Sequence, residues 1–249
     1  PFLLPLLGWN AGWVVAAVAS AGLALVLGWE TRGLRPPPAR PQGSRLLGDF
    51  REVLAQPGAW LCAAMFGFYS STFMAVFGFL PTFLVERQGI GLTAAILLSA
   101  FGVLMNAPGN IAGGWLARQG VPRWGLIMIG CTTMALSSLG IFSDALPVWA
   151  RYALALSFSF VGGFIPATIF GIAPSFAPRP DLVSTVAGFV VQGSSIGQLL
   201  GPPVMAALVA YVGGWQAAPL LLTGAGCVNI VLALLLRRLE RRRCAVAVA

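Results

Sequence analysis

The 249-residue chain contains no lysine and no histidine, and it has only seven acidic residues. Charged residues make up 9% of the sequence, against about 25% in an average soluble domain. Hydrolases and metal sites depend on histidines, paired acids or a nucleophile with its base, and the acids here all lie near the ends of apolar runs. We therefore expect no catalytic residue, no metal site and no cofactor.

Cysteine is also scarce, and its four copies follow no ligand pattern. Cys62, Cys131, Cys227 and Cys244 are widely spaced, and no C-x-x-C pair occurs. This spacing argues against a metal site or a disulfide framework. Three of the four stand inside apolar segments, which predicts buried, inert thiols.

Hydrophobic residues are abundant, at 58% of the chain, which excludes a disordered protein. The 31 glycines follow no G-X-Y period, which excludes collagen. The net charge of +8 comes from arginines that stand in short connectors between apolar runs, not on one basic face, so a nucleic-acid partner is not expected. An integral membrane protein, with the lipid bilayer as its surroundings, is the class that fits.

Seven apolar runs are long enough to cross a bilayer, which takes about 20 residues in a helix. The runs are continuous rather than alternating, which favours helices over a barrel. The expected spans are residues 11–29, 59–85, 92–116, 124–142, 152–174, 184–211 and 215–236. An eighth apolar stretch, residues 1–7, opens on Pro1 without a basic region before it, so we expect an N-terminal part to precede this chain.

The arginines between these spans predict an orientation. Successive connectors must lie on alternate sides of the membrane, and assigning them in this way places thirteen arginines on one side and two on the other. The larger group is Arg32, Arg35, Arg40, Arg45, Arg51, Arg118, Arg123, Arg179, Arg237, Arg238, Arg241, Arg242 and Arg243, and the smaller is Arg87 and Arg151. Because positive residues collect on the cytoplasmic side, the C-terminus is expected in the cytoplasm.

The connector of residues 30–58 is the longest polar stretch. Apolar residues recur at helical spacing from Leu46 to Leu54, beside Asp49, Arg51 and Glu52. This pattern predicts an amphipathic helix on the cytoplasmic surface. An ordinary solvated linker is the alternative.

A short sequence near the start of the chain is repeated near its end. Gly12-Trp13 and Gly214-Trp215 each open an apolar span, 202 residues apart, and six spans separate the copies. A six-helix unit repeated in parallel is the plan of one large class of transporters.

With these features the chain resembles the major facilitator superfamily. Beyond the basic central connector, the segment from Gly113 to Arg123 is similar to the family's cytoplasmic loop motif. Gly113, Arg118, Gly120 and Arg123 match that motif, whereas Ala117 stands where the family has an acid. In the family this acid pairs with charges on neighbouring helix ends, so the alanine puts that charge pairing in doubt here.

A second matching feature is a glycine face that ends in proline. Gly193, Gly197 and Gly201 recur every four residues before Pro202, so one smooth face lets a neighbouring backbone approach. It is similar to the Gly-rich, Pro-ended motif of antiporters in this superfamily. Helix packing and a role in coupling both remain open for it.

The resemblance implies an all-α membrane bundle that forms part of a twelve-helix carrier. Residues 1–29 would be the end of the fifth helix and the sixth helix, 30–58 the central loop, 59–236 the C-terminal six-helix bundle, and 237–249 a cytoplasmic tail. The missing N-terminal half would be its partner, and a bacterial cytoplasmic membrane its location. Residues 79–84 and 192–203 are similar to cyanate and nitroimidazole permeases.

Polar residues inside the spans are the candidates for solute contact, since buried polar groups must pair or face a wet cavity. The resemblance places the cavity along the seventh and tenth helices of this half. Tyr69 and Gln192 are the first choices, followed by Asn106 and Ser195. Interhelical packing is the alternative for each of them.

The resulting function is a secondary transporter that moves a small organic solute by alternating access, and not an enzyme. Two alternatives stay open. The chain could be the permease subunit of an ATP-driven transporter, whose ATPase would be another subunit because no P-loop pattern is present. It could also be an intramembrane enzyme, which the lack of histidine disfavours.

Overall fold

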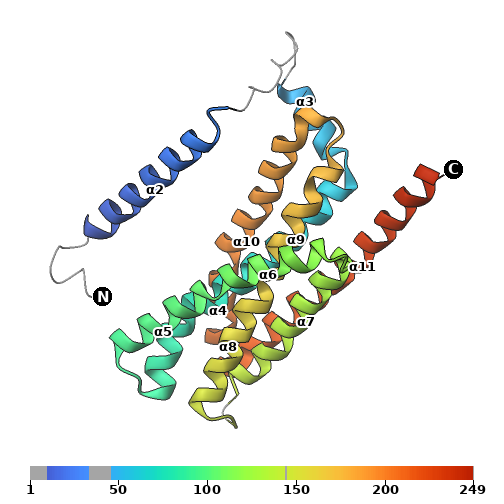
Figure 1. Ribbon diagram of the computed structural model, residues 1–249. Coiled ribbons are helices and arrows are strands. Elements are labelled where there is room, and N and C mark those ends of the chain that lie inside the picture. Colours follow the sequence, from blue (N-terminus) through green and yellow to red (C-terminus); the bar gives the residue numbers. More distant parts are fainter. Residues whose placement is uncertain (1–9, 34–45, 144, 249) are drawn as a thin grey trace. The chain divides into compact units, whose positions relative to one another are not determined.

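The computed structural model describes residues 10–33, 46–143 and 145–248, and this part of the chain is helical (Figure 1). It contains seven helical segments long and apolar enough to cross a membrane. This number and the approximate positions confirm the seven predicted spans. The first of them, α2 (Asn10–Glu30), belongs to a separate unit of the chain, and the other six lie in the unit that begins at Arg45.

The six spans of the larger unit alternate in direction, and two of them are broken. Four are single helices, and the first three of these are α4 (Pro57–Gln88), α7 (Arg123–Ile141) and α10 (Val183–Val212). The broken spans are α5 (Leu92–Leu104) with α6 (Asn106–Arg118), and α8 (Val148–Gly162) with α9 (Phe164–Ile172). The last is α11 (Ala218–Val248), and short 3₁₀ turns at Ala173–Phe176, Pro180–Leu182 and Trp215–Ala217 join the later helices.

The two broken spans cross each other at their breaks. A Cβ atom at Gly109 would overlap the backbone of Phe160, and one at Gly163 would lie 2.6 Å from the carbonyl oxygen of Asn106. Glycine is therefore needed for the close approach of α6 to the α8–α9 junction. This crossing fixes the position of Asn106 relative to the span formed by α8 and α9.

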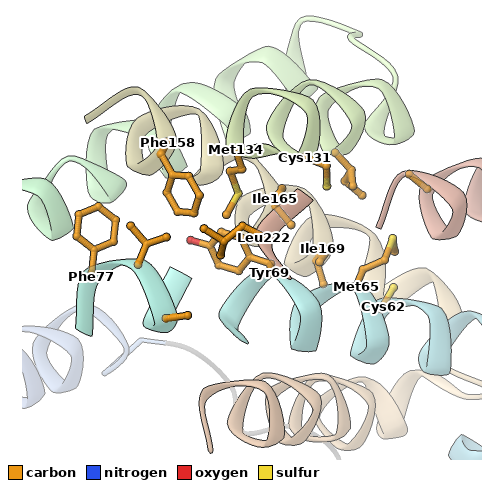
Figure 2. Close-up of a cluster of buried hydrophobic side chains, with 14 of the residues drawn as sticks. Cys62, Met65, Tyr69, Phe77, Cys131, Met134, Phe158, Ile165, Ile169 and Leu222 are labelled. Atoms are coloured by element: carbon orange, nitrogen blue, oxygen red, sulfur yellow. The ribbon is translucent and has the colours of Figure 1, made fainter. Parts of the chain in front are cut away.

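An apolar core joins α4 to other helices of the unit, among them α7, α8, α9 and α11. It brings Met65, Tyr69 and Phe77 of α4 together with Cys131 and Met134 of α7, Phe158 of α8, Ile165 and Ile169 of α9, and Leu222 of α11 (Figure 2). Cys62 and Cys131 are buried as predicted, but Cys227 is exposed, because it lies on a face of α11 that no other helix of this unit covers. That prediction was therefore wrong for one thiol.

The predicted amphipathic helix is present as α3 (Leu46–Leu54), and it packs against the bundle. Val53 is fully buried and the Phe50 ring meets Phe189 of α10 edge-on, at 6.3 Å between centroids. The indole N–H of Trp60 donates to the carbonyl oxygen of Leu54 at 2.8 Å. Helix α3 is thus attached to the six-helix unit and is not a solvated linker.

One arginine ties α3 to the connection between α9 and α10. Arg179 Nη2 lies 2.5 Å from Asp49 Oδ1, and its Nε lies 3.2 Å from Glu52 Oε2. Asp181 is the third carboxylate beside this guanidinium, at 3.8 Å. The hydrogen bond to Asp49 raises the pKa of Arg179, so the cation persists at any physiological pH.

Of the arginines that were expected to share one side, those described in this unit gather at one end of it, and these are Arg51, Arg118, Arg123, Arg179, Arg237, Arg238 and Arg241. Arg35, Arg40 and Arg45 lie outside the described residues. Helix α3, the α6–α7 turn, the start of α10 and the C-terminal part of α11 lie at that end (Figure 1). There the guanidinium of Arg237 lies 4.3 Å from the centroid of the Trp124 ring. Residues 237–248, expected as a tail, continue α11 without a break, since arginine, glutamate and leucine are good helix formers.

Candidate functional site

A hollow of about 480 Å³ opens between α4, α6, α9 and α10. Its size falls within the range of small-molecule sites in proteins. It is lined by Phe66, Tyr69, Ser70, Phe73, Met74, Phe77, Gly78, Val103, Asn106, Asn110, Pro166, Ser194 and Gln198. None of these lining residues carries a charge.

Tyr69 and Asn106, two of the four predicted contact residues, meet at this hollow. Asn106 Nδ2 donates to the Tyr69 hydroxyl oxygen at 2.9 Å and to the Ser159 carbonyl oxygen at 2.9 Å. Asn110 Nδ2 donates in turn to Asn106 Oδ1 at 2.8 Å. Because Tyr69 accepts from Asn106, its own O–H hydrogen is not used in this bond and can donate to another acceptor.

The sequence pattern explains why these side chains share a face. Asn106 and Asn110 are four residues apart in α6, so they lie one turn apart on the same side. On α4 the lining residues recur at three- and four-residue spacing, which makes one continuous stripe. Helix α4 runs unbroken through Tyr69 and Thr72, although polar residues interrupt its apolar run there. Thr72 Oγ1 donates to the Tyr69 carbonyl oxygen at 2.8 Å, within its own helix.

The opposite wall of the hollow comes from α10. Ser70 and Ser194 share a buried hydrogen bond of 2.6 Å between their hydroxyl oxygens. Gln198 Nε2 donates to Ser194 Oγ at 3.1 Å. These neutral groups face the Tyr69–Asn106–Asn110 chain across the aromatic side chains of α4, so the hollow has hydrogen-bonding groups on both sides.

Gln192 and Ser195, the other two predicted contact residues, lie away from this hollow. Ser195 is exposed and its hydroxyl donates to the Val191 carbonyl oxygen, within its own helix, at 3.1 Å. Gln192 lines a separate, mostly apolar groove of about 320 Å³ between α4 and α10, beside Trp60, Phe68 and Phe189. The structure therefore brings only Tyr69 and Asn106 of the four together.

Ser194 and Gln198 were not among the preferred residues, although they belong to the same polar run. The available signal was the glycine face, which marks the side of α10 that touches α4. In a helix, Ser194 and Gln198 flank that face on one side, Gln192 lies on the other, and Ser195 lies opposite. The sequence alone does not reveal which flank faces the hollow.

The glycine face of α10 packs directly on the backbone of α4. A Cβ atom at Gly193, Gly197 or Gly201 would overlap the backbone of Ala63, Gly67 or Ser71, respectively. Pro202 and Pro203 lie inside α10, which continues through them to Val212. The predicted close approach is confirmed, and it fixes Ser194 and Gln198 at the edge of the hollow.

The loop motif forms the turn from α6 to α7. Arg118 ends α6 and Arg123 begins α7, and Gly120 between them has a φ of +88°, which favours glycine. Gly113 lies in α6 itself, where a Cβ atom would fall 2.7 Å from the Phe164 Cα. In this structure the two glycines thus have different roles. Gly120 allows a tight turn, and Gly113 allows a close contact between helices.

The described charged residues lie at the ends of the spans, away from the hollow. Arg151, expected just before a span, lies in the first turn of α8 and is largely buried. Its Nε donates to the Leu146 carbonyl oxygen at 2.7 Å. At the same end, the Trp215 indole N–H donates to Glu86 Oε2 at 3.4 Å.

Comparison with known proteins agrees with this architecture. The chain is 28% identical over 240 residues to mouse (Mus musculus) monocarboxylate transporter 11, which covers 87% of this chain and 50% of that protein. The structure is similar to a bacterial homologue of the human lysosomal transporter Spinster, inward-facing and unoccupied. That similarity has a TM-score of 0.59 and 18% identity, and it covers 92% of this chain and 57% of the other.

The chain therefore spans about half the length of the relatives that it matches. The family model of the Major Facilitator Superfamily matches residues 1–202, most of the sequence. Together with the seven helical segments long and apolar enough to cross a membrane, this match shows that the chain belongs to the major facilitator superfamily.

Proposed function

We propose that this chain contributes one side of the solute site of a secondary transporter. The surface that lines the hollow between α4, α6, α9 and α10 is that side. The single observation that carries the proposal is the Tyr69–Asn106–Asn110 chain, which presents neutral hydrogen-bonding groups at a 480 Å³ hollow. Polar residues inside a membrane bundle face its interior or a water-filled cavity, where they can contact a substrate. The solute is a small organic molecule, which this side of the site contacts by hydrogen bonds and apolar surface.

Transport proceeds by alternating access in this proposal, with the six-helix unit moving largely as a rigid body. Two features support the rigidity of the unit. Helix α10 is seated on α4 through backbone contact at three glycines, and α3 is attached through Arg179. The expected membrane is a bacterial cytoplasmic membrane, with the C-terminal part of α11 in the cytoplasm.

Monocarboxylates are the first solutes to test, because one relative is named as a monocarboxylate transporter. The hollow itself contains no cationic side chain, so a carboxylate would find its counter-charge outside these lining residues. The solute's apolar body and its uncharged polar atoms are what this side of the site can bind.

Uptake of labelled pyruvate into proteoliposomes tests the proposal, using the protein that contains this chain and an imposed ion gradient without ATP. We expect gradient-driven uptake that falls at least about tenfold in Asn106→Ala, since the loss of paired buried groups near a site costs 1.4 kcal/mol or more. Leu199→Ala, on the exposed opposite face of α10, is the matched control. Uptake that appears only with ATP and a second subunit would instead establish the permease alternative.

A further inference from the structure

Four aromatic rings form a continuous row along α4, and all four border the hollow. Phe66, Tyr69, Phe73 and Phe77 follow one another with centroid separations of 6.0, 5.7 and 4.8 Å. The first pair is stacked, with 14° between the ring planes, and the other two pairs are tilted. We call these four residues the ring row.

Rings from other helices hold both ends of the ring row. Phe170 of α9 meets Phe66 edge-on at 5.3 Å, and Phe158 of α8 meets Phe77 edge-on at 6.2 Å. Tyr69 is fixed by Asn106 as well. Phe66 and Phe73 remain only half-buried, so part of the row is open to a molecule in the hollow.

Hydrogen-bonding side chains stand on both sides of the ring row. Asn106 and Asn110 of α6 lie on the side of Tyr69, which accepts from Asn106, and Ser194 and Gln198 of α10 lie on the side of Ser70, which bonds Ser194. All of them are neutral, and three of the four carry an amide. A molecule that covers the row therefore meets apolar rings under its body and amide groups at its edges.

Resting on the function proposed above, we infer that the site prefers solutes that carry an aromatic ring, which packs on the ring row, and an uncharged amide-like polar group, which bonds at its edge. Aromatic rings gain from offset-stacked and edge-to-face contacts beyond the area that they bury. A saturated ring of the same size buries similar area without that gain. The row therefore selects a planar aromatic body over an aliphatic one.

Binding of two matched amides tests the inference on the protein that contains this chain, embedded in lipid nanodiscs. The probes are tritiated benzamide and cyclohexanecarboxamide, which share the amide and differ in the ring, and binding to empty nanodiscs is subtracted. We expect saturable binding of benzamide about threefold to tenfold tighter than that of the saturated amide. Equal affinities, a reversed order, or no saturable binding of benzamide would overturn the inference.

Substitutions in the ring row provide the second arm. Phe73→Leu is expected to remove the preference for benzamide, whereas Phe73→Tyr, which retains a ring, is expected to keep it. Phe68→Leu is the matched control, because Phe68 is on the same helix but lines the separate groove near Gln192. A preference that survives in Phe73→Leu, or that disappears in Phe68→Leu, would show that the ring row only packs against other helices.

The two proposals fail in different ways. Gradient-driven uptake of pyruvate without any preference between the amides would leave the transporter proposal in place and refute the preference for aromatic solutes. A preference for benzamide that Phe73→Leu removes, without uptake of pyruvate or benzamide into proteoliposomes, would establish the aromatic site and refute transport.

Discussion

At the scale of single residues, Asn106 connects three helices at the edge of the hollow. Its amide nitrogen donates both to Tyr69 of α4 and to Ser159 of α8. Hydrogen bonds of this kind each contribute about 0.5–1.5 kcal/mol to stability in proteins, and their values between membrane helices are in a similar range. A structural role and solute contact are therefore compatible at this position.

Replacing Asn106 by alanine should lower the free energy of unfolding by about 1.5–3 kcal/mol, because three side-chain hydrogen bonds are lost. Thermal unfolding in detergent, followed by circular dichroism, measures this change. Ser195→Ala is the control, since its hydroxyl bonds only its own helix, and it should change stability by less than about 0.5 kcal/mol. Equal losses in the two variants would show that the Asn106 bonds contribute nothing specific.

Tyr69 and Asn106, two of the four predicted contact residues, line the hollow that we propose as the site, and the other two lie away from it for a geometric reason. Tyr69 and Asn106 stood out because a phenol and an amide are rare inside apolar spans. On α10 the polar residues surround the helix, and a single sequence gives their angles relative to one another but not the direction of the cavity. The choice of Gln192 and Ser195 over Ser194 and Gln198 followed from that ambiguity.

At the scale of helices, the contact between α4 and α10 depends on small residues. Gly197→Ala should destabilise the unit by about 1–3 kcal/mol, because the new methyl group would overlap the Gly67 backbone and force the helices apart. Gly188→Ala, in the same helix but facing open space, should not lower the melting temperature. Unfolding in detergent compares the two, and a Gly197→Ala variant as stable as the parent would contradict the close packing.

The attachment of α3 gives a second prediction at this scale. Arg179→Ala should raise the rate at which a maleimide modifies Val53→Cys by up to about fivefold, because the partly exposed ion pairs contribute at most about 1 kcal/mol. The native cysteines are replaced beforehand, and Asp49→Asn serves as the partner variant. If the rate stays unchanged in both variants, apolar contacts alone hold α3.

The helices themselves were predictable from the sequence, because apolar length determines a membrane span. The breaks at Met105 and Gly163 were not predicted, although each lies three residues before a proline, Pro108 or Pro166, which removes a hydrogen bond of the helix. The docking of α3 was also not predictable, because an amphipathic pattern identifies an apolar face without naming the surface that covers it.

At the scale of the whole molecule, the arginines predict which end faces the cytoplasm. Gln119→Cys, in the α6–α7 turn, should be protected from a membrane-impermeant maleimide in intact cells. Gln88→Cys, at the end of α4, should react under the same conditions. Both variants are made without the native cysteines, and permeabilised cells provide the control for reactivity. The reverse pattern would invert the proposed orientation.

The central claim is that the hollow, and not the lipid-facing side of α10, is where this chain meets a solute in water. Modification of Gln198→Cys by a water-soluble maleimide in proteoliposomes tests it most directly, with the adjacent Leu199→Cys as the control. Thiols react as thiolates, which form readily only in contact with water. The account predicts rapid modification of Gln198→Cys and little of Leu199→Cys, which is 73% exposed but on the opposite face. Equal modification of the two, or modification of Leu199→Cys alone, would contradict it.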